Sequence, residues 1–196
     1  MLSIKQAYAP FKDIRPKLPY FHDASPMVCT YKLTAYHAAR AMERAVSTKI
    51  FDFEKFDLDE CEYYENVENG DLNWIIRDRC MAFAGPQTSR EAGLLDGYST
   101  LTPEDYFDYF KKKKIYNLIR LNKKYYDAKR FDPIGVKVHD IYFRDGSTPT
   151  LRQVKMFNKY MESFPKGEGI GVHCKAGLGR TSPIARENNP RSEDHN

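Results

Sequence analysis

The sequence lacks three features that would place it in common protein classes. It has no signal peptide and no run of 18 apolar residues, so we expect an intracellular chain with no membrane partner. Its net charge is only +4, from 31 basic and 27 acidic residues, which gives no reason to expect a nucleic-acid partner. Its four cysteines have no spacing typical of a zinc site, which favours reduced thiols; they are Cys29, Cys61, Cys80 and Cys174.

The composition that remains is that of a globular protein. Apolar residues make up 41% of the 196 positions and aromatic residues 14%, which is enough to build a core in one or two small domains. We therefore look for function in local motifs rather than in composition.

Residues 169–181 are the most informative stretch, because they predict a short buried strand, a glycine-rich loop and the start of a helix. With Gly177 and Gly179 in the loop, the backbone N–H groups can turn inward and bind an oxyanion at the positive end of the helix. Cys174 lies where the strand ends. The amide dipoles, the helix and Arg180 should all lower its thiol pKa below the value of about 8.5 for a free cysteine. The pattern predicts a thiolate that attacks phosphorus.

Arg180 follows Cys174 by six residues and can place its planar guanidinium on the same anion. The spacing alone is weak, because about one chain in four of this composition would show it by accident. The context is stronger, since His173 precedes the cysteine and the Thr181 hydroxyl follows the arginine. The alternative is a buried structural cysteine beside a tight turn.

Several separated motifs between about residues 7 and 181 carry a family resemblance. They are H-C-K-A-G-L-G-R-T, F-R-D-G-S-T-P, R-L-N-K-K-Y-Y-D-A-K-R-F and E-N-G-D-L-N-W-I-I. Together they resemble the cell-division-cycle-fourteen family of dual-specificity protein phosphatases. The resemblance implies two phosphatase-like domains, the second catalytic, with a parallel or mixed sheet flanked by helices. It also implies action on phosphoserine followed by proline, on phosphothreonine and on phosphotyrosine, no cofactor, and a place in the nucleus and cytoplasm.

The resemblance also implies roles for individual residues. Asp145, 29 residues before Cys174, would protonate the departing oxygen, although an aspartate after a strand is usually only a turn residue. Thr181 would stabilise the leaving thiolate, and the phosphate would be held by the loop residues Lys175, Ala176, Gly177, Leu178, Gly179 and Arg180. Glu62 and Glu65 would attract a basic residue downstream of the phosphoserine-proline pair; the alternative is an ordinary solvated helix.

Secondary-structure signals predict an alternation of strands and helices around this site. Helices are expected at about residues 30–47, 102–113, 125–131 and 150–164, the last with Thr148 as cap and Pro149 in its first turn; strands are expected at 80–84, 115–121 and 136–143. Such an order favours a mostly parallel sheet. We divide the chain into a partial first domain (1–84), a linker (85–98), a partial catalytic domain (99–185) and a disordered tail (186–196).

A rival hypothesis is a non-catalytic chain that at most binds phosphoproteins, or one without a stable fold. The helix after the loop would contain Pro183 and meet Pro190, and the polar stretch after residue 185 offers no apolar face to bury. We therefore expect this helix to span at most about two turns and the chain to be a poor phosphatase. The oligomeric state is left open.

Overall fold

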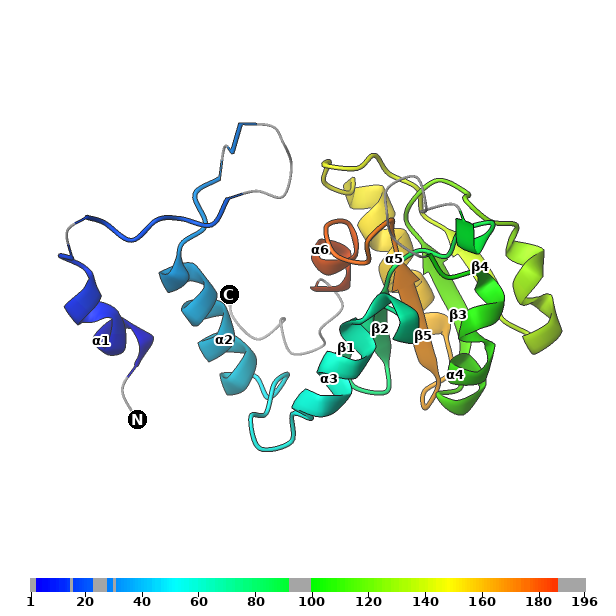
Figure 1. Ribbon diagram of the computed structural model, residues 1–196, viewed down its shortest axis with the longest axis horizontal. Helices are drawn as coiled ribbons and strands as arrows, with labels where there is room; N and C mark the ends of the chain where they lie inside the picture. Colours follow the sequence, from blue (N-terminus) through cyan, green and yellow to red (C-terminus); the bar gives the residue numbers. More distant parts are fainter. Residues whose placement is uncertain (1–2, 15, 23–27, 30, 92–99, 187–196) are drawn as a thin grey trace. The chain divides into compact units, whose positions relative to one another are not determined.

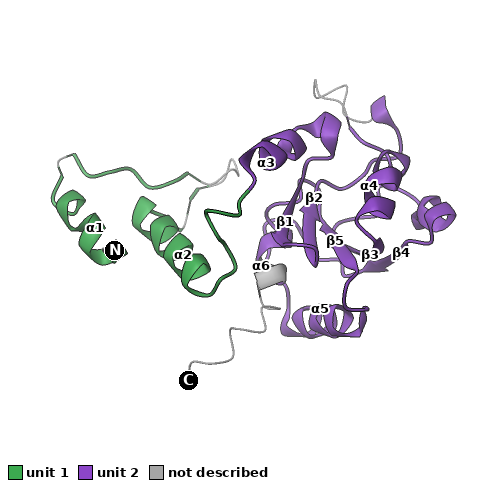
Figure 2. Cartoon of the chain, turned by 90° about the horizontal axis from the view of Figure 1, so that it is seen from below, with its two compact units in different colours: residues 1–56 green, residues 57–196 purple. Residues whose placement is uncertain are grey.

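The computed structural model describes the chain except for residues 1–2, 15, 23–27, 30, 92–99 and 187–196. The chain divides into two compact units, Met1–Phe56 and Asp57–Asn196, which are coloured separately in Figure 2. Each unit is described by itself. In the part of the chain that the structure describes, no helix combines the length and apolar character needed to cross a membrane.

Unit 1 consists of short helices without a buried interior. It contains α1 (Ile4–Tyr8), the 3-10 turn η1 (Ala9–Phe11) and α2 (Ala35–Ser47). The predicted helix at 30–47 begins only at Ala35, because the Thr34 hydroxyl accepts a hydrogen bond from the His37 amide and caps the helix there. None of the described residues of unit 1 is buried, so its helices lack the packing that normally stabilises such short segments.

Unit 2 is built on a five-stranded mixed sheet (Figure 1). Its strands, in spatial order, are β1 (Leu72–Ile76), β2 (Cys80–Phe83), β5 (Gly169–His173), β3 (Ile115–Arg120) and β4 (Lys137–Asp140). The last four run parallel to one another, and only β1 runs antiparallel, to its neighbour β2. The mixed α/β class expected from the sequence is confirmed.

Helices and short 3-10 segments connect these strands. They are α3 (Leu58–Glu65), η2 (Val67–Asn69), η4 (Pro103–Tyr106), α4 (Phe107–Lys112), η5 (Ala128–Ile134), α5 (Leu151–Ser163) and α6 (Thr181–Arg186). The described part of α6 spans six residues and ends where the described chain ends, so the predicted length of this helix stays a prediction. Helix α5 begins at Leu151, one residue later than predicted, and its cap lies two residues later. Thr150, not Thr148, accepts the capping hydrogen bond from the Gln153 amide, so Pro149 lies before the helix.

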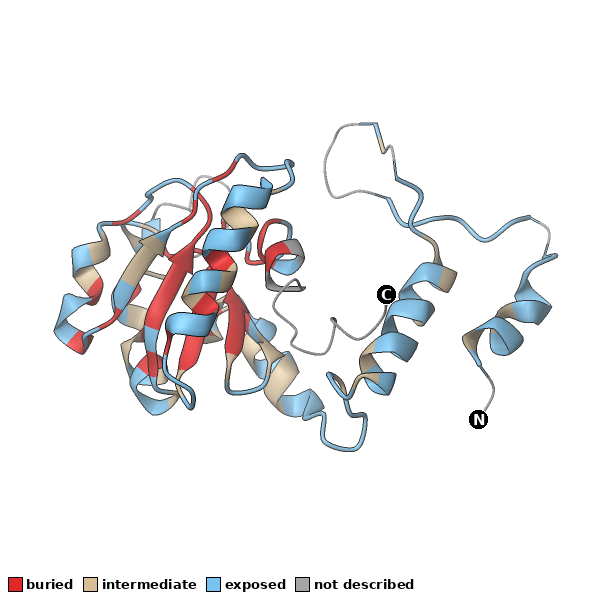
Figure 3. Ribbon diagram, turned by 180° about the vertical axis from the view of Figure 1, so that it is seen from behind, coloured by how far each residue is buried: buried red, intermediate tan, exposed pale blue. Residues whose placement is uncertain are grey.

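The core has two apolar clusters, one on each face of the sheet. Successive side chains of a strand point to opposite faces. Leu118 of β3 accordingly joins the cluster around Phe110 of α4, and Ile119 joins the cluster around Phe157 of α5. In Figure 3 the buried residues concentrate in these strands. Both faces of β5 are covered, and its five residues are all buried.

The structure corrects the predicted domain boundary. Strand β2 pairs with β5 along its whole length, so residues 57–84 belong to the same unit as the glycine-rich loop. The boundary between compact units lies after Phe56 instead of after residue 84. The Gly85-Pro86 pair resembles linker composition, but Gly85 is buried and its amide donates to Lys175 O. Residues 92–98 of the predicted linker, and the predicted tail from 187 onward, lie outside the described residues.

Candidate active site

The ends of the parallel strands bring the predicted site residues to one edge of the sheet. Strand β5 ends at His173, and residues 174–180, here called the Cys174 loop, connect it to α6. Strand β3 lies between β5 and β4, so the strands that lead to Cys174 and Asp145 are not neighbours in the sheet. They still end on the same edge, because all three run parallel.

Cys174 is a buried thiol with a lowered pKa. Only 3% of the residue is exposed. Burial by itself would raise the pKa of the thiol and is the largest single influence. It is outweighed by the Thr181 hydroxyl, the Arg180 and Thr181 amides and the Arg180 charge, which together bring the pKa below its ordinary value. The thiolate predicted from the motif is therefore favoured by groups within the loop and the first turn of α6.

Apart from the Cys174 thiol, the buried Thr181 hydroxyl oxygen has no hydrogen-bond partner among the described residues. The buried Nε of Arg180 makes no hydrogen bond there either, although it forms an ion pair with Asp145. The Arg180 Nη1 atom makes only a long bond of 3.3 Å to Phe143 O. Buried donors normally have acceptors. A thiolate at Cys174 and an oxyanion bound in the loop would both be negatively charged hydrogen-bond acceptors for these donors.

Asp145 forms an ion pair with Arg180. Its Oδ1 is 3.3 Å from Nε of Arg180, an ion pair in which the aspartate side chain is 70% exposed and the arginine 6%. The turn that follows is closed by a bond from the Ser147 amide to Arg144 O, with Gly146 at a φ of 71°. The structure thus brings Asp145 to Arg180, while the carboxylate stays accessible to solvent.

The two loop glycines have different reasons to be glycine. Gly177 has a φ of 70°, and a Cβ atom there would lie 2.6 Å from the backbone of Phe83. Gly179 has neither a positive φ nor a neighbour within 4 Å of such an atom. Only Gly177 is therefore required by geometry. Of the other predicted phosphate-binding residues, Lys175, Ala176 and Leu178 are exposed on the loop.

His173 and Tyr126 support the loop from within the core. His173 is fully buried, and burial lowers its pKa to about 4. Its Nδ1 lies 3.2 Å from Cys174 O, which can only accept, so Nδ1 carries the proton. Its Nε2 then accepts from the Tyr126 hydroxyl at 2.8 Å. His173 thus links the Cys174 carbonyl to Tyr126, a residue that sequence reasoning missed because nothing in its spacing marks it.

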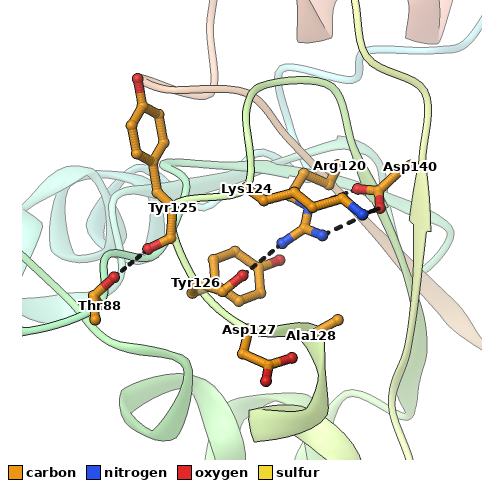
Figure 4. Close-up of a pocket in the computed structure, with 8 residues that line it drawn as sticks. All are labelled: Thr88, Arg120, Lys124, Tyr125, Tyr126, Asp127, Ala128 and Asp140. Atoms are coloured by element: carbon orange, nitrogen blue, oxygen red, sulfur yellow. Dashed lines mark hydrogen bonds and ion pairs between the residues drawn. The ribbon is translucent and has the colours of Figure 1, made fainter.

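A pocket of about 440 Å³ has no residue of the Cys174 loop in its lining. Figure 4 shows its eight lining residues, which surround the ends of β3 and β4. Its wall contains the buried Arg120 guanidinium, which donates to both carboxylate oxygens of Asp140 and to Tyr126 O. Lys124 Nζ lies 3.2 Å from the same carboxylate, so both cations of the pocket lining are already paired with Asp140. Within the described residues, no three His, Cys, Asp or Glu side chains gather as a metal site requires.

Comparisons with known proteins give the same family as the sequence motifs. The family model described as "Polymorphic toxin system, DSP-PTPase phosphatase" matches residues 92–185. Human dual specificity protein phosphatase CDC14A is 46% identical over 170 residues, which are 86% of this chain and 28% of that protein. The chain is a relative of the CDC14 dual specificity phosphatases. Human CDC14C is 47% identical over 170 residues, which are 86% of this chain and 37% of CDC14C.

This chain spans about a third or less of the length of the CDC14 proteins mentioned. A solved structure of kinase-associated phosphatase, with its catalytic cysteine changed to serine, is also similar. It has a TM-score of 0.44 and 16% identity, covering 56% of this chain and 63% of that one.

The two glutamates predicted to attract a basic substrate residue lie on α3, in the same unit as the Cys174 loop. Glu62 and Glu65 are both exposed. Glu65 is close enough to Asp71 to raise the pKa of that half-buried carboxyl, although burial contributes more. None of the described contacts joins either glutamate to the Cys174 loop, so their role stays a prediction.

Proposed function

We propose that this chain is a cysteine-dependent dual-specificity protein phosphatase that hydrolyses phosphoserine, phosphothreonine and phosphotyrosine. The observation that carries the proposal is the thiol of Cys174, whose pKa is lowered although it is buried, next to a buried arginine that pairs with Asp145. The relationship to CDC14 proteins supports it.

In the first step, the Cys174 thiolate attacks phosphorus and forms an S–P bond, while the bond from phosphorus to the substrate oxygen breaks. The loop amides and Arg180 hold the three equatorial oxygens. Binding of phosphate to Arg180 replaces its pairing with Asp145. The protonated Asp145 then gives its proton to the leaving oxygen, and the substrate departs as the free hydroxyl compound.

In the second step, water hydrolyses the phosphocysteine. The Asp145 carboxylate takes a proton from water as the water oxygen bonds to phosphorus, and the S–P bond breaks. The Thr181 hydroxyl donates to the thiolate that leaves, consistent with its buried oxygen lacking another partner among the described residues. Every proton is accounted for by Asp145 and water, so we expect no cofactor.

The finer features are proposals that follow the resemblance. Phosphoprotein substrates would carry phosphoserine followed by proline, with a downstream basic residue attracted by Glu62 and Glu65. The exposure of both glutamates is compatible with such a role. We further propose a cell-cycle function in the nucleus and cytoplasm.

A non-catalytic, phosphoprotein-binding chain is the second candidate. It is favoured by unit 1, in which none of the described residues is buried. It is also favoured by the pairing of Asp145 with the same arginine that would bind phosphate. Such a chain could bind a phosphorylated peptide in the loop without positioning the acid.

Hydrolysis of 4-nitrophenyl phosphate by the purified chain separates the two candidates. We expect turnover that is lost in Cys174→Ser. With a phosphoserine peptide, Asp145→Asn should lower kcat by about 100-fold or more, because a serine alkoxide cannot leave without a proton. The aryl phosphate should lose less, since its leaving group is a weaker base. Absence of turnover in the unmodified chain, with phosphopeptide binding retained, would support the non-catalytic candidate.

A further inference from the structure

The segment that follows β2 lies directly against the start of the Cys174 loop. The Gly85 amide donates to Lys175 O at 2.9 Å. A Cβ atom built on Gly85 would lie 2.2 Å from Cys174 O and 2.9 Å from Nδ1 of His173. Cβ atoms in folded proteins do not approach other atoms this closely, so only glycine leaves room for the loop at this point.

The middle of the loop touches the same segment. A Cβ atom on Gly177 would lie 2.6 Å from both the backbone carbon and the backbone oxygen of Phe83, and 3.0 Å from the Ala84 nitrogen. Backbone therefore lies on backbone at two separate points of the loop. Side chains can rotate away from a clash, but backbone atoms move only if the chain moves.

The segment is itself tied down on its other side. The Tyr106 hydroxyl is buried and lies 2.9 Å from Gly70 O and 3.3 Å from Ala84 O. The Ala84 amide donates to Asp71 O at 2.9 Å. Residues 83–85 are the last residue of β2 and the two residues that follow it. They are held by these bonds on one side and contact the loop on the other, and we call them the loop platform.

We propose that the loop platform is a positioning element of the active site, with Gly85 as the residue that allows the Cys174 loop to keep its amides directed at the thiol and the phosphate. This inference rests on the proposed phosphatase function. Gly85 does not have a positive φ, so its role is to leave space and not to provide a backbone conformation. Replacing it with alanine would have to displace Cys174 O by about 1 Å to reach ordinary contact distance.

The effect would fall on the thiol, because of the two amides that favour the thiolate, that of Arg180 belongs to the displaced loop and that of Thr181 follows it directly. Hydrogen bonds weaken steeply when their geometry changes. We therefore expect Gly85→Ala to raise the pH midpoint for alkylation of Cys174 by about one unit, toward that of an ordinary thiol. We also expect kcat/KM for 4-nitrophenyl phosphate to fall by about 100-fold, as misplacements near 1 Å do in other enzymes.

Iodoacetamide labelling of the full chain between pH 4 and 10, with Cys174 followed by mass spectrometry, measures the midpoint without requiring turnover. Gly169→Ala is the matched control. Its Cβ atom would lie 2.8 Å from Ile115 Cγ1, 3.0 Å from Trp74 Cη2 and 3.3 Å from Lys113 O, so its nearest neighbours belong neither to the loop nor to the loop platform. It should lower the melting temperature yet leave the midpoint unchanged.

Tyr106→Phe is a second test variant, needed if Gly85→Ala does not fold. It removes only the hydroxyl that faces the Ala84 carbonyl. It should shift the midpoint in the same direction by a smaller amount. The proposal is overturned if folded Gly85→Ala keeps the original midpoint, if Gly169→Ala shifts it equally, or, where Gly85→Ala is unfolded, if Tyr106→Phe does not shift it. If the midpoint shifts as expected but the unmodified chain has no turnover, the loop platform stands and the proposed function falls.

Discussion

Acid should destabilise this protein through His173 before most of its carboxylates are protonated. The imidazole is fully buried and neutral, and burial lowers its pKa from 6.5 to about 4. A histidine with a depressed folded pKa binds its proton more readily in the unfolded chain. Its effect on stability is therefore complete above pH 6.5 and is lost as the pH falls toward 4.

The size of this loss follows from the shift. A difference of 2.5 pKa units, from 6.5 to about 4, corresponds to roughly 3 kcal/mol of unfolding free energy, most of it lost by pH 4. Small domains are stable by about 5–15 kcal/mol in total. Protonation of this single side chain would thus remove a large share of the stability of unit 2, and with it the support of the Cys174 loop.

Urea unfolding between pH 4 and 7 tests the reasoning, with the fluorescence of Trp74 as the signal. This residue is the only tryptophan of the chain, lies on β1 and donates from Nε1 to the Tyr109 hydroxyl at 3.0 Å, so it reports on unit 2. His173→Asn keeps a donor for Cys174 O but cannot take up a proton. Carboxylates such as Glu104, whose pKa is lowered to about 2 mainly by Arg130, titrate in both proteins and cancel.

We expect the stability advantage of the unmodified protein over His173→Asn to shrink by roughly 3 kcal/mol between pH 7 and pH 4. An advantage that stays constant within about 0.5 kcal/mol would refute the assignment of a neutral buried imidazole.

Three further predictions concern the proposed chemistry. Iodoacetamide at neutral pH should label Cys174 first, because burial raises the pKa of Cys61 and raises that of Cys80 to about 12; equal labelling of all four cysteines in folded protein would contradict this. Arg180→Lys should lower kcat/KM for 4-nitrophenyl phosphate by about 10-fold or more, because lysine cannot form the two parallel hydrogen bonds of a bidentate arginine; wild-type kinetics in this variant would exclude bidentate binding of phosphate by Arg180. Changing Glu62 and Glu65 together to Ala should lower kcat/KM for a phosphoserine-proline peptide with a downstream lysine and leave the aryl phosphate unaffected; a parallel loss on both substrates would make the glutamates structural.

Much of the sheet and the charged part of the site could be predicted from sequence. Strands at 80–84 and 115–121 agree with β2 and β3 to within one residue, because short apolar runs between turn residues have few alternatives. The strand at 136–143 proved shorter, because only residues 137–140 pair with β3. The loop motif predicted a thiol with a lowered pKa beside Arg180, and the structure has that arrangement.

The contacts made by backbone atoms could not be predicted. Gly85 followed by proline has the composition of a linker, and it was assigned to one, yet its amide holds the loop through Lys175 O. Nothing in the spacing of Tyr126 indicates that its hydroxyl would reach His173, 47 residues later. Both contacts depend on which strands are neighbours, and strand order is a property of the whole sheet rather than of a local pattern.

The reactivity of Cys174 depends on such backbone contacts. Burial is the largest single influence on the thiol and acts against ionisation, so the pKa is lowered only because several short-range donors act together. Two of these donors are backbone amides, whose direction depends on how residues 174–180 lie on the chain beneath them. A cysteine and an arginine at the right spacing therefore supply the reacting atom and the charge. Whether the thiol ionises depends on glycines such as Gly177 and Gly85, which contribute no functional group and act by leaving room for backbone to meet backbone.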